Sequence, residues 1–408
     1  MPELSAKLSS VSTDTAHRPV SWLILLALAV GGFGIGTGEF VIMGLMPTMA
    51  ADLGVTEPQV GHVISAYALG VVVGAPILAV LGARLRRRHL LLLLMVFFAL
   101  GNAATALAPG YHSLLLARFV TGLPHGAYFG VAALVAASMV PAPKRAAAVS
   151  QVMLGLTIAI LIGNPLATLV GQSMDWRYAF VAVSIIALLT IVLIGVFLPL
   201  DRSEPRSNPL TELQAFRRIQ VWYALGIGAI GFAGMFCVFS YLAVTLLEVT
   251  KVSSLLVPLA VATFGAGTLV GNLAGGWLFE RLQFRAVGVV LLWSMAVLLL
   301  FPFAVQTWWA ALLAAFLVGT MVALSPPLQT RLMDVAADAQ TLAAASHHAA
   351  FNVANALGPW LGGLAISAGL GWTVTGYVGA ATAAIGMLLF VLAWQHERRH
   401  PQDVRCGA

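Results

Sequence analysis

Twelve long apolar stretches dominate this sequence and restrict its fold more than any other feature. Each has about 20 residues or more, the length that a helix needs to cross a bilayer. Ten of the twelve contain no Asp, Glu, Lys or Arg. Because the stretches lack the alternating pattern of a membrane barrel, we predict an all-α polytopic membrane protein. The predicted spans are residues 22–46, 59–82, 90–108, 113–140, 147–170, 179–200, 221–247, 254–279, 286–304, 309–330, 342–366 and 372–394.

The composition agrees with this class of protein. Hydrophobic residues make up 60% of the chain and charged residues only 9%, whereas about a quarter of a soluble chain is charged. The 40 glycines favour closely packed membrane helices.

Motifs for ATP-driven transport or serine hydrolysis are missing from the sequence. It contains no Gly-x-x-x-x-Gly-Lys loop and no Gly-x-Ser-x-Gly elbow, and its one His-Glu-x-x-His match, at residues 396–400, falls in the short tail after the last apolar stretch and not in a soluble domain. The pair His347-His348 is too isolated for a metal site. We therefore expect no enzyme activity, no cofactor and no metal; a membrane sensor or membrane enzyme would need a catalytic constellation or a soluble domain.

The net charge of +6 is better explained by membrane topology than by nucleic-acid binding. With residues 1–21 in the cytoplasm, 18 of the 21 Lys and Arg fall on cytoplasmic segments, leaving Arg118, Arg177 and Lys251. This positive-inside bias orients the chain with both termini in the cytoplasm. The predicted segments are a cytoplasmic tail at 1–21, a six-helix bundle at 22–200, a cytoplasmic linker at 201–220, a second six-helix bundle at 221–394 and a tail at 395–408.

The two halves resemble each other, which suggests duplication of a six-span unit. An offset of 197 relates Gly70 and Gly74 to Gly267 and Gly271. Chance matching of glycines in apolar helices is the alternative. The same offset relates Phe119-Val120-Thr121-Gly122 to Phe316-Leu317-Val318-Gly319, and an offset of 194 relates Gly163-Asn164-Pro165 to Leu357-Gly358-Pro359.

The fifth predicted span carries small residues at every fourth position, next to a proline. Such a ridge allows close approach of helix backbones, and Pro165 should kink the helix. The eleventh span repeats the device around Pro359. A bent helix with small residues along one face is suited to an interface at which the two halves rock against each other. Static helix packing is the alternative. The two ridges are Gly155, Ala159, Gly163, Ala167 and Gly171, and Ala350, Ala354, Gly358 and Gly362.

These motifs resemble those of the major facilitator superfamily, and more narrowly its twelve-span drug:proton antiporters of the arabinose-efflux and chloramphenicol-resistance type. The resemblance covers about residues 20–395. It is carried by Gly36-Thr37-Gly38-Glu39-Phe40 with Gly44-Leu45-Met46-Pro47, by Ala117-Arg118-Phe119-Val120-Thr121-Gly122 with His125-Gly126, by Gly163-Asn164-Pro165, and by Gly358-Pro359-Trp360-Leu361-Gly362-Gly363. The resemblance implies the major facilitator fold, with twelve transmembrane helices in two six-helix bundles.

One motif departs from the family pattern. The loop after the second span normally carries an aspartate before its basic cluster, but here the position is Ala83. The second-half copy keeps an acid, Glu280. A charge latch between the halves is therefore in doubt on the first-half side, and the basic cluster is better interpreted as an anchor on anionic lipid.

Glu39 is the one acidic residue well inside an apolar stretch, and Arg118 is the one base at its expected depth. Intramembrane charges are functional candidates by default, and at 1.5 Å per residue both lie about 8–10 Å below the outer surface. Pairing with Arg118 favours a charged carboxylate, whereas burial without it favours the protonated acid. A conformational change could therefore load or release one proton; a permanent structural salt bridge is the alternative.

Further polar and aromatic residues are candidates for proton transfer or substrate binding. His125 lies on the Arg118 face near the bilayer centre. It could relay protons or bind substrate, and a hydrogen-bonded packing group is the alternative. The candidate substrate-binding residues, which could equally be packing or interhelical partners, are Met43, Tyr67, Tyr128, Asn164, Phe236, Tyr241, His348, Asn352 and Asn355.

Taken together with the resemblance, these features predict proton-coupled efflux of a small organic molecule across the inner membrane by alternating access. A proton-coupled importer or an uncoupled facilitator of a sugar, nucleoside or amino-acid derivative is the alternative. We expect a monomer whose partners are substrate, protons and membrane lipids, without nucleic acid.

Overall fold

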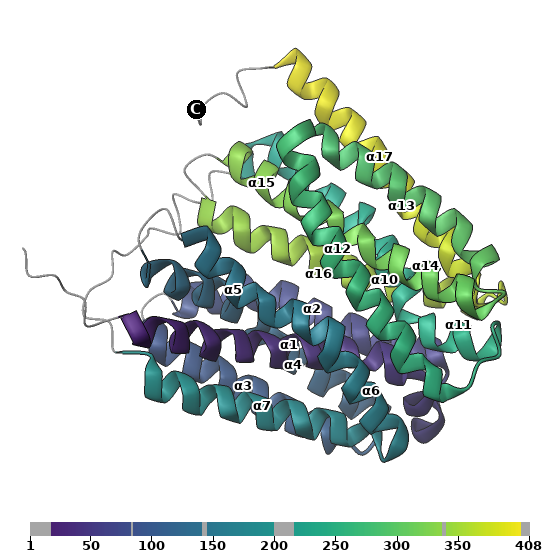
Figure 1. The fold of residues 1–408 in the computed structure, drawn as a ribbon, viewed down its shortest axis with the longest axis horizontal. Coiled ribbons are helices and arrows are strands. Elements are labelled where there is room, and N and C mark those ends of the chain that lie inside the picture. The colour runs from purple at the N-terminus through teal and green to yellow at the C-terminus, as the bar shows by residue number, and fades with distance from the viewer. Residues whose placement is uncertain (1–17, 83–84, 141–144, 200–215, 337–339, 401–408) are drawn as a thin grey trace, which may run out of the picture.

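The computed structural model describes residues 18–82, 85–140, 145–199, 216–336 and 340–400. Every regular element in these ranges is a helix. Figure 1 shows the helices in two bundles, the first half of the chain in purple to teal and the second half in green to yellow. The all-α membrane fold predicted from the sequence is confirmed.

Each bundle contains the helices of one half of the chain. The first consists of α1 (Arg18–Leu53), α2 (Glu57–Gly82), α3 (Arg87–Ala106), α4 (Tyr111–Ser138), α5 (Arg145–Ile158), η2 (Ala159–Gly163), α6 (Asn164–Ser173) and α7 (Trp176–Phe197). The second consists of α9 (Ile219–Gly226), η4 (Ile227–Gly231), α10 (Ala233–Ser240), α11 (Leu242–Glu248), η5 (Ser254–Leu256), α12 (Val257–Leu282), α13 (Arg285–Ala304), α14 (Trp308–Thr320), η6 (Met321–Leu324), α15 (Ser325–Ala336), α16 (Gln340–Ser367) and α17 (Val374–Arg399). The predicted tail at 1–21, the linker at 201–220 and the last residues of the chain lie largely outside the described residues.

Within the described residues, 11 helices are long and apolar enough to cross a membrane. The remaining predicted span corresponds to α16, which has 28 residues. Its polar side chains, among them His347, His348, Asn352 and Asn355, lower its hydropathy. Because polar residues inside a membrane helix mark functional positions, α16 is expected to contribute to a site.

The predicted duplication is visible in how the helices pack. A side chain at Gly70 on α2 would collide with the backbone of Phe119 on α4, and one at Gly267 on α12 would collide with the backbone of Phe316 on α14. These positions differ by 197 in both cases. In each bundle, a glycine at the equivalent position therefore allows two helices to come into backbone contact.

The fifth span is interrupted close to where Pro165 predicted a kink. The chain passes from α5 through a π-helical turn, η2, into α6, which begins at Asn164. A proline removes the donor that a regular α-helix needs, and π-turns commonly absorb such defects. The seventh span is interrupted in the same way at η4, which the sequence did not predict.

The small-residue ridges pack within their own bundles. Added side chains at Gly155 and Gly163 would meet Ala29, Phe33 and Thr37 of α1. The ridge on α16 likewise faces α10, where Gly358 approaches Ala233 and Cys237. The fifth span also meets the second bundle, because a side chain at Gly265 on α12 would collide with the backbone of Ile160 and Leu161 in η2. The interpretation of the ridges as a rocking interface stays a prediction, with static packing as the alternative.

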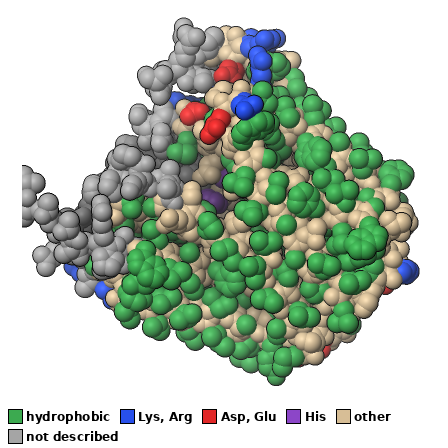
Figure 2. Space-filling model, viewed as in Figure 1, with side chains coloured by type: hydrophobic (Ala, Val, Ile, Leu, Met, Phe, Trp, Pro, Cys, Tyr) green, Lys and Arg blue, Asp and Glu red, His purple; other side chains and the backbone are tan. Residues whose placement is uncertain are grey.

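The bundles contact each other between α2 and α16, toward the end that is opposite the chain termini, and between α12 and the fifth span at η2 and α6. Ser65 Oγ donates a hydrogen bond to the carbonyl oxygen of Ala356 at 2.7 Å. A side chain at Gly363 would meet Pro58 at the start of α2. Figure 2 shows a hollow between the bundles on the side of the grey segments, with histidine atoms visible in it.

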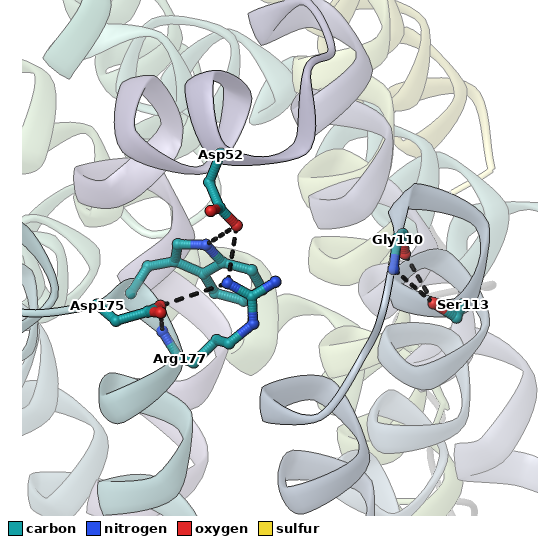
Figure 3. A network of polar contacts seen from close by, with 6 residues as sticks. Asp52, Gly110, Ser113, Asp175 and Arg177 are labelled. Carbon is teal, nitrogen blue, oxygen red and sulfur yellow. Dashed lines mark hydrogen bonds and ion pairs between the residues drawn. The ribbon is translucent and has the colours of Figure 1, made fainter.

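At the end opposite the termini, basic side chains are paired with acids. Arg177 Nη1 lies 2.7 Å from Asp52 Oδ2 and 3.5 Å from Asp175 Oδ1 (Figure 3). Lys251 Nζ lies 3.3 Å from Glu248 Oε2. The two basic residues that the topology prediction placed outside are thus both neutralised by acidic neighbours.

Candidate functional site

The structure brings the three residues predicted to handle protons into one buried cluster. Glu39 is on α1, and Arg118 and His125 are on α4 of the same bundle. Their exposed fractions are 4%, 0% and 4%. Buried charges are rare unless paired, so the cluster requires a functional explanation.

Glu39 is hydrogen-bonded across the contact between the bundles. Its Oε1 accepts a hydrogen bond from Asn355 Nδ2 on α16 at 2.8 Å. Its Oε2 lies 3.9 Å from His125 Nδ1. The carboxyl group therefore joins the two halves of the chain at the depth of the cluster.

Arg118 does not reach the Glu39 carboxyl group. No ion pair joins these two described side chains; Arg118 Nη2 instead donates to the carbonyl oxygen of Gly38 at 2.9 Å. Its guanidinium carbon lies 4.2 Å from the ring centre of Tyr67 and 5.4 Å from that of Phe180. Aromatic faces stabilise a buried cation, while Nε and Nη1 remain without a partner.

Tyr67 on α2 lies between the arginine and the histidine. Its hydroxyl oxygen is 3.0 Å from His125 Nδ1, in a hydrogen bond whose direction depends on the histidine tautomer. Its ring faces Arg118. Tyr67, a predicted substrate residue, therefore contacts two of the three predicted proton-handling residues.

The glycines around Glu39 explain how α1 reaches this position. A side chain at Gly38 would meet Val183, Asn102 and Phe98, and one at Gly36 would collide with α5 and η2. Only residues without a side chain allow α1 to approach its neighbours this closely. The Gly-x-Gly-Glu segment therefore places the carboxyl group and the Gly38 carbonyl oxygen inside the bundle.

Three of the candidate substrate-binding residues, His348, Asn352 and Asn355, lie on α16 beside the cluster. Asn352 Nδ2 donates to the His348 carbonyl oxygen at 3.0 Å, and the His348 ring stacks at 6.3 Å on Phe129 of α4. The amide oxygens of Asn352 and Asn355 are buried without a partner. Such orphaned acceptors are uncommon, and they offer positions for a molecule that donates hydrogen bonds.

Aromatic rings surround the site on the side of the second bundle. Phe236, a predicted substrate residue, stacks with Phe40 of α1 at 6.2 Å between ring centres. Phe232 packs against Phe236 at 5.4 Å and against Phe351 at 4.4 Å. These rings form a buried apolar contact between the bundles, beginning at Phe40, the residue that follows Glu39.

Other predicted substrate residues lie apart from the cluster. The Tyr128 hydroxyl donates to the carbonyl oxygen of Leu28 at 2.8 Å, and the Tyr241 hydroxyl donates to that of Pro359 at 2.8 Å. Met43 is 1% exposed in the hydrophobic core. Asn164 is fully buried with neither amide atom paired. A substrate role for these four residues stays a prediction.

Ser65 and Phe129 were not predicted from the sequence. Ser65 joins α2 to α16, and Phe129 stacks on His348. A serine or a phenylalanine in a membrane helix is ordinary, so the sequence held no signal for either role.

Comparison with known proteins places the whole chain among membrane transporters. A family model described as "Major Facilitator Superfamily" matches residues 28–255 and 224–405. The "Inner membrane transport protein YdhP" of Escherichia coli K12 is 39% identical over 381 residues, covering 93% of this chain and 97% of that protein. The "Chloramphenicol resistance protein" of Streptomyces lividans is 34% identical over 380 residues, covering 90% and 94%.

A crystal structure of a bacterial homologue of the human lysosomal transporter Spinster, inward-facing and unoccupied, has the same fold. Its TM-score is 0.75 at 17% identity, and the match covers 96% of this chain and all of that one. The chain is thus similar to transporters along nearly its full length.

Proposed function

The chain belongs to the Major Facilitator Superfamily, and on that premise we propose that it exports a small organic molecule in exchange for protons. Glu39 is the proton carrier in this proposal. The similarity to a protein named for chloramphenicol resistance supports export of a drug-like compound. The name of the E. coli relative supports a location in the inner membrane.

The observation that carries the proposal is the hydrogen bond between Glu39 and Asn355, 2.8 Å long. Hydrogen bonds to a charged carboxylate are roughly twice as strong as neutral ones. Protonation of Glu39 would therefore weaken the bond that holds α1 to α16. A single proton thus acts directly on a contact between the two bundles, as alternating access requires.

The neighbours of Glu39 provide a route and a counter-charge for that proton. His125 lies 3.9 Å from the carboxyl group and is hydrogen-bonded to Tyr67. A histidine ring can take up a proton at one nitrogen and release one from the other, so His125 is the proposed relay on the basis of its position between Glu39 and Tyr67. Arg118 remains protonated, and its unpaired Nε and Nη1 are available to an acceptor in another conformation.

Substrate binding acts on the same contact. The free amide oxygens of Asn352 and Asn355 suit a ligand with hydroxyl or N–H donors, and the Phe40, Phe232 and Phe236 rings suit an aromatic or apolar body. A ligand donor can bind the free Asn355 oxygen while the Asn355 nitrogen still donates to Glu39. In this proposal a second ligand donor binds the Glu39 carboxylate, which a proton on Glu39 would prevent, so proton and substrate exclude each other as exchange requires.

Transport by purified protein in proteoliposomes tests the proposal. A counterflow screen with labelled compounds, chloramphenicol among them, identifies a substrate. We expect Glu39→Gln to abolish uphill transport driven by a pH gradient but to retain counterflow. The matched control is Glu248→Gln, which removes an exposed carboxyl group and should transport like the parent protein.

The same experiment distinguishes export from import. In an exchanger, protons flow from the acidic to the alkaline side and substrate moves the opposite way, so substrate accumulates on the acidic side. In a proton-coupled importer, substrate moves with the protons and accumulates on the alkaline side. Accumulation on the alkaline side, or uphill transport that survives Glu39→Gln, would contradict the proposal.

A further inference from the structure

A cavity of about 340 Å³ lies at the end of the second bundle that carries the chain terminus. It is formed by the turn between α12 and α13 and by the last turns of α17, and its walls include Leu282, Phe284, Arg285, Trp394 and Arg398. None of these residues belongs to the cluster around Glu39. The cavity therefore needs an explanation other than transport chemistry.

Two arginines converge on one tryptophan in this cavity. The guanidinium carbon of Arg398 lies 4.8 Å from the ring centre of Trp394, and that of Arg285 lies 5.8 Å from the same ring. In the described part of the chain, neither guanidinium has an ion pair or a hydrogen bond. Two positive charges face the cavity without a counter-charge.

The acidic residue of the cavity wall is already neutralised. Glu397 accepts hydrogen bonds from Arg331 Nη1 at 3.3 Å and from Arg331 Nη2 at 2.9 Å. Arg331 is 6% exposed and packs over Phe284 at 4.4 Å. This bidentate pair satisfies both carboxylate oxygens, so Glu397 does not compensate Arg285 or Arg398.

We propose that this cavity binds the phosphodiester headgroup of an anionic phospholipid. The Arg285 and Arg398 guanidinium groups bind the phosphate, because their N–H donors match its oxygens. Trp394 has the ring chemistry that favours the membrane–water boundary, and Leu282 and Phe284 supply apolar surface for the adjoining glycerol and acyl chain. Basic pockets at this boundary are typical headgroup sites; zwitterionic lipids, which carry their own cation, bind less well.

Native mass spectrometry of the purified protein tests this assignment. The full-length protein in non-ionic detergent is titrated with phosphatidylglycerol or phosphatidylcholine of the same acyl chains. We expect a preference of about tenfold for phosphatidylglycerol, which corresponds to about 1.4 kcal/mol. Equal retention of the two lipids by the parent protein would overturn the proposal without recourse to any variant.

Paired variants locate the site. Arg285→Gln with Arg398→Gln should remove the preference for phosphatidylglycerol. Arg281→Gln with Arg399→Gln removes the same charge from the same end of the molecule but from outside the cavity wall, and should keep the preference. Thermal unfolding without added lipid confirms that both proteins are folded; if the two pairs behave alike, binding is non-specific attraction.

A soluble anion distinguishes the two sources of phosphate. Millimolar inorganic phosphate should leave phosphatidylglycerol bound to the parent protein, because it lacks the apolar part that contacts Leu282 and Phe284. Displacement of the lipid by inorganic phosphate would show an anion site with no lipid component, and would contradict the proposal.

Discussion

At the scale of single residues, the site depends on a few polar atoms in an apolar interior. The sequence identified Glu39, Arg118 and His125 because charged and titratable groups are rare in membrane helices. It also named Tyr67 and Asn355 as candidate substrate-binding residues, but not their contacts with His125 and Glu39. Which way an arginine points, toward a carboxylate or toward the Gly38 carbonyl oxygen, depends on side-chain rotation that no sequence pattern encodes.

Asn355→Leu tests the bond between the bundles. The substitution leaves Glu39 Oε1 without its donor at 2.8 Å, and an unsatisfied buried group costs about 1–3 kcal/mol. We expect a lower melting temperature in detergent and altered dependence of transport on pH. Asn352→Leu is the control for the melting temperature alone, because Asn352 bonds to its own helix and does not contact Glu39, whereas its free amide oxygen is a proposed substrate contact. Equal effects of the two substitutions would show that the hydrogen bond between Glu39 and Asn355 stabilises the protein no more than a hydrogen bond within one helix.

At the scale of helices, the two halves keep the same packing but differ in polarity. The offset of 197 that relates the packing glycines also relates Tyr67 to Phe264 and Arg118 to Ala315. The second bundle thus repeats the backbone contacts with apolar side chains at these two positions, and its buried histidine and asparagine side chains lie on α16 instead. Glycine spacing made the packing predictable, whereas the interruption at η4 contains no proline and could not be predicted.

Gly122→Ala tests the backbone contact between α4 and α2. An added side chain would collide with the carbonyl oxygen of Tyr67, and forced insertion into a packed core costs about 1–3 kcal/mol. Gly319→Ala should behave alike, since it would collide with Phe264 in the second bundle. Gly130→Ala, also on α4, meets no atom within 4 Å and should melt like the parent protein. A stable Gly122→Ala would show that the helices separate easily.

At the scale of the whole molecule, length and hydropathy determined the architecture. Apolar segments that are long enough to span a bilayer are compatible with few folds other than a helical bundle. The number and order of the spans could therefore be predicted from the sequence. The way in which the two bundles contact each other could not be predicted from the sequence, because some of these contacts involve ordinary residues such as Ser65 and Pro58. Their identification required the structure.

Cysteine labelling tests the proposed orientation. With Cys237 and Cys406 replaced by Ser, Gly110→Cys and His400→Cys place one thiol at each end of the molecule. A side chain at Gly110 meets no atom within 4 Å, and His400 follows α17 on the exposed surface. The positive-inside bias predicts that a membrane-impermeant reagent added to cells labels position 110 and not position 400. Labelling of position 400 alone would show that the chain has the opposite orientation in the membrane.

The exchange of a proton for substrate at Glu39 is the central claim, and proton release on substrate binding measures it most directly. Purified protein in weakly buffered detergent solution is mixed with a substrate identified by counterflow, and the pH change is followed with an indicator dye. The account predicts that the parent protein releases protons and that Glu39→Gln, which retains the amide shape without a titrating proton, binds substrate and releases none. Equal proton release by Glu39→Gln and the parent protein would contradict it, and would move the proton site to another residue, with His125 the next to be tested.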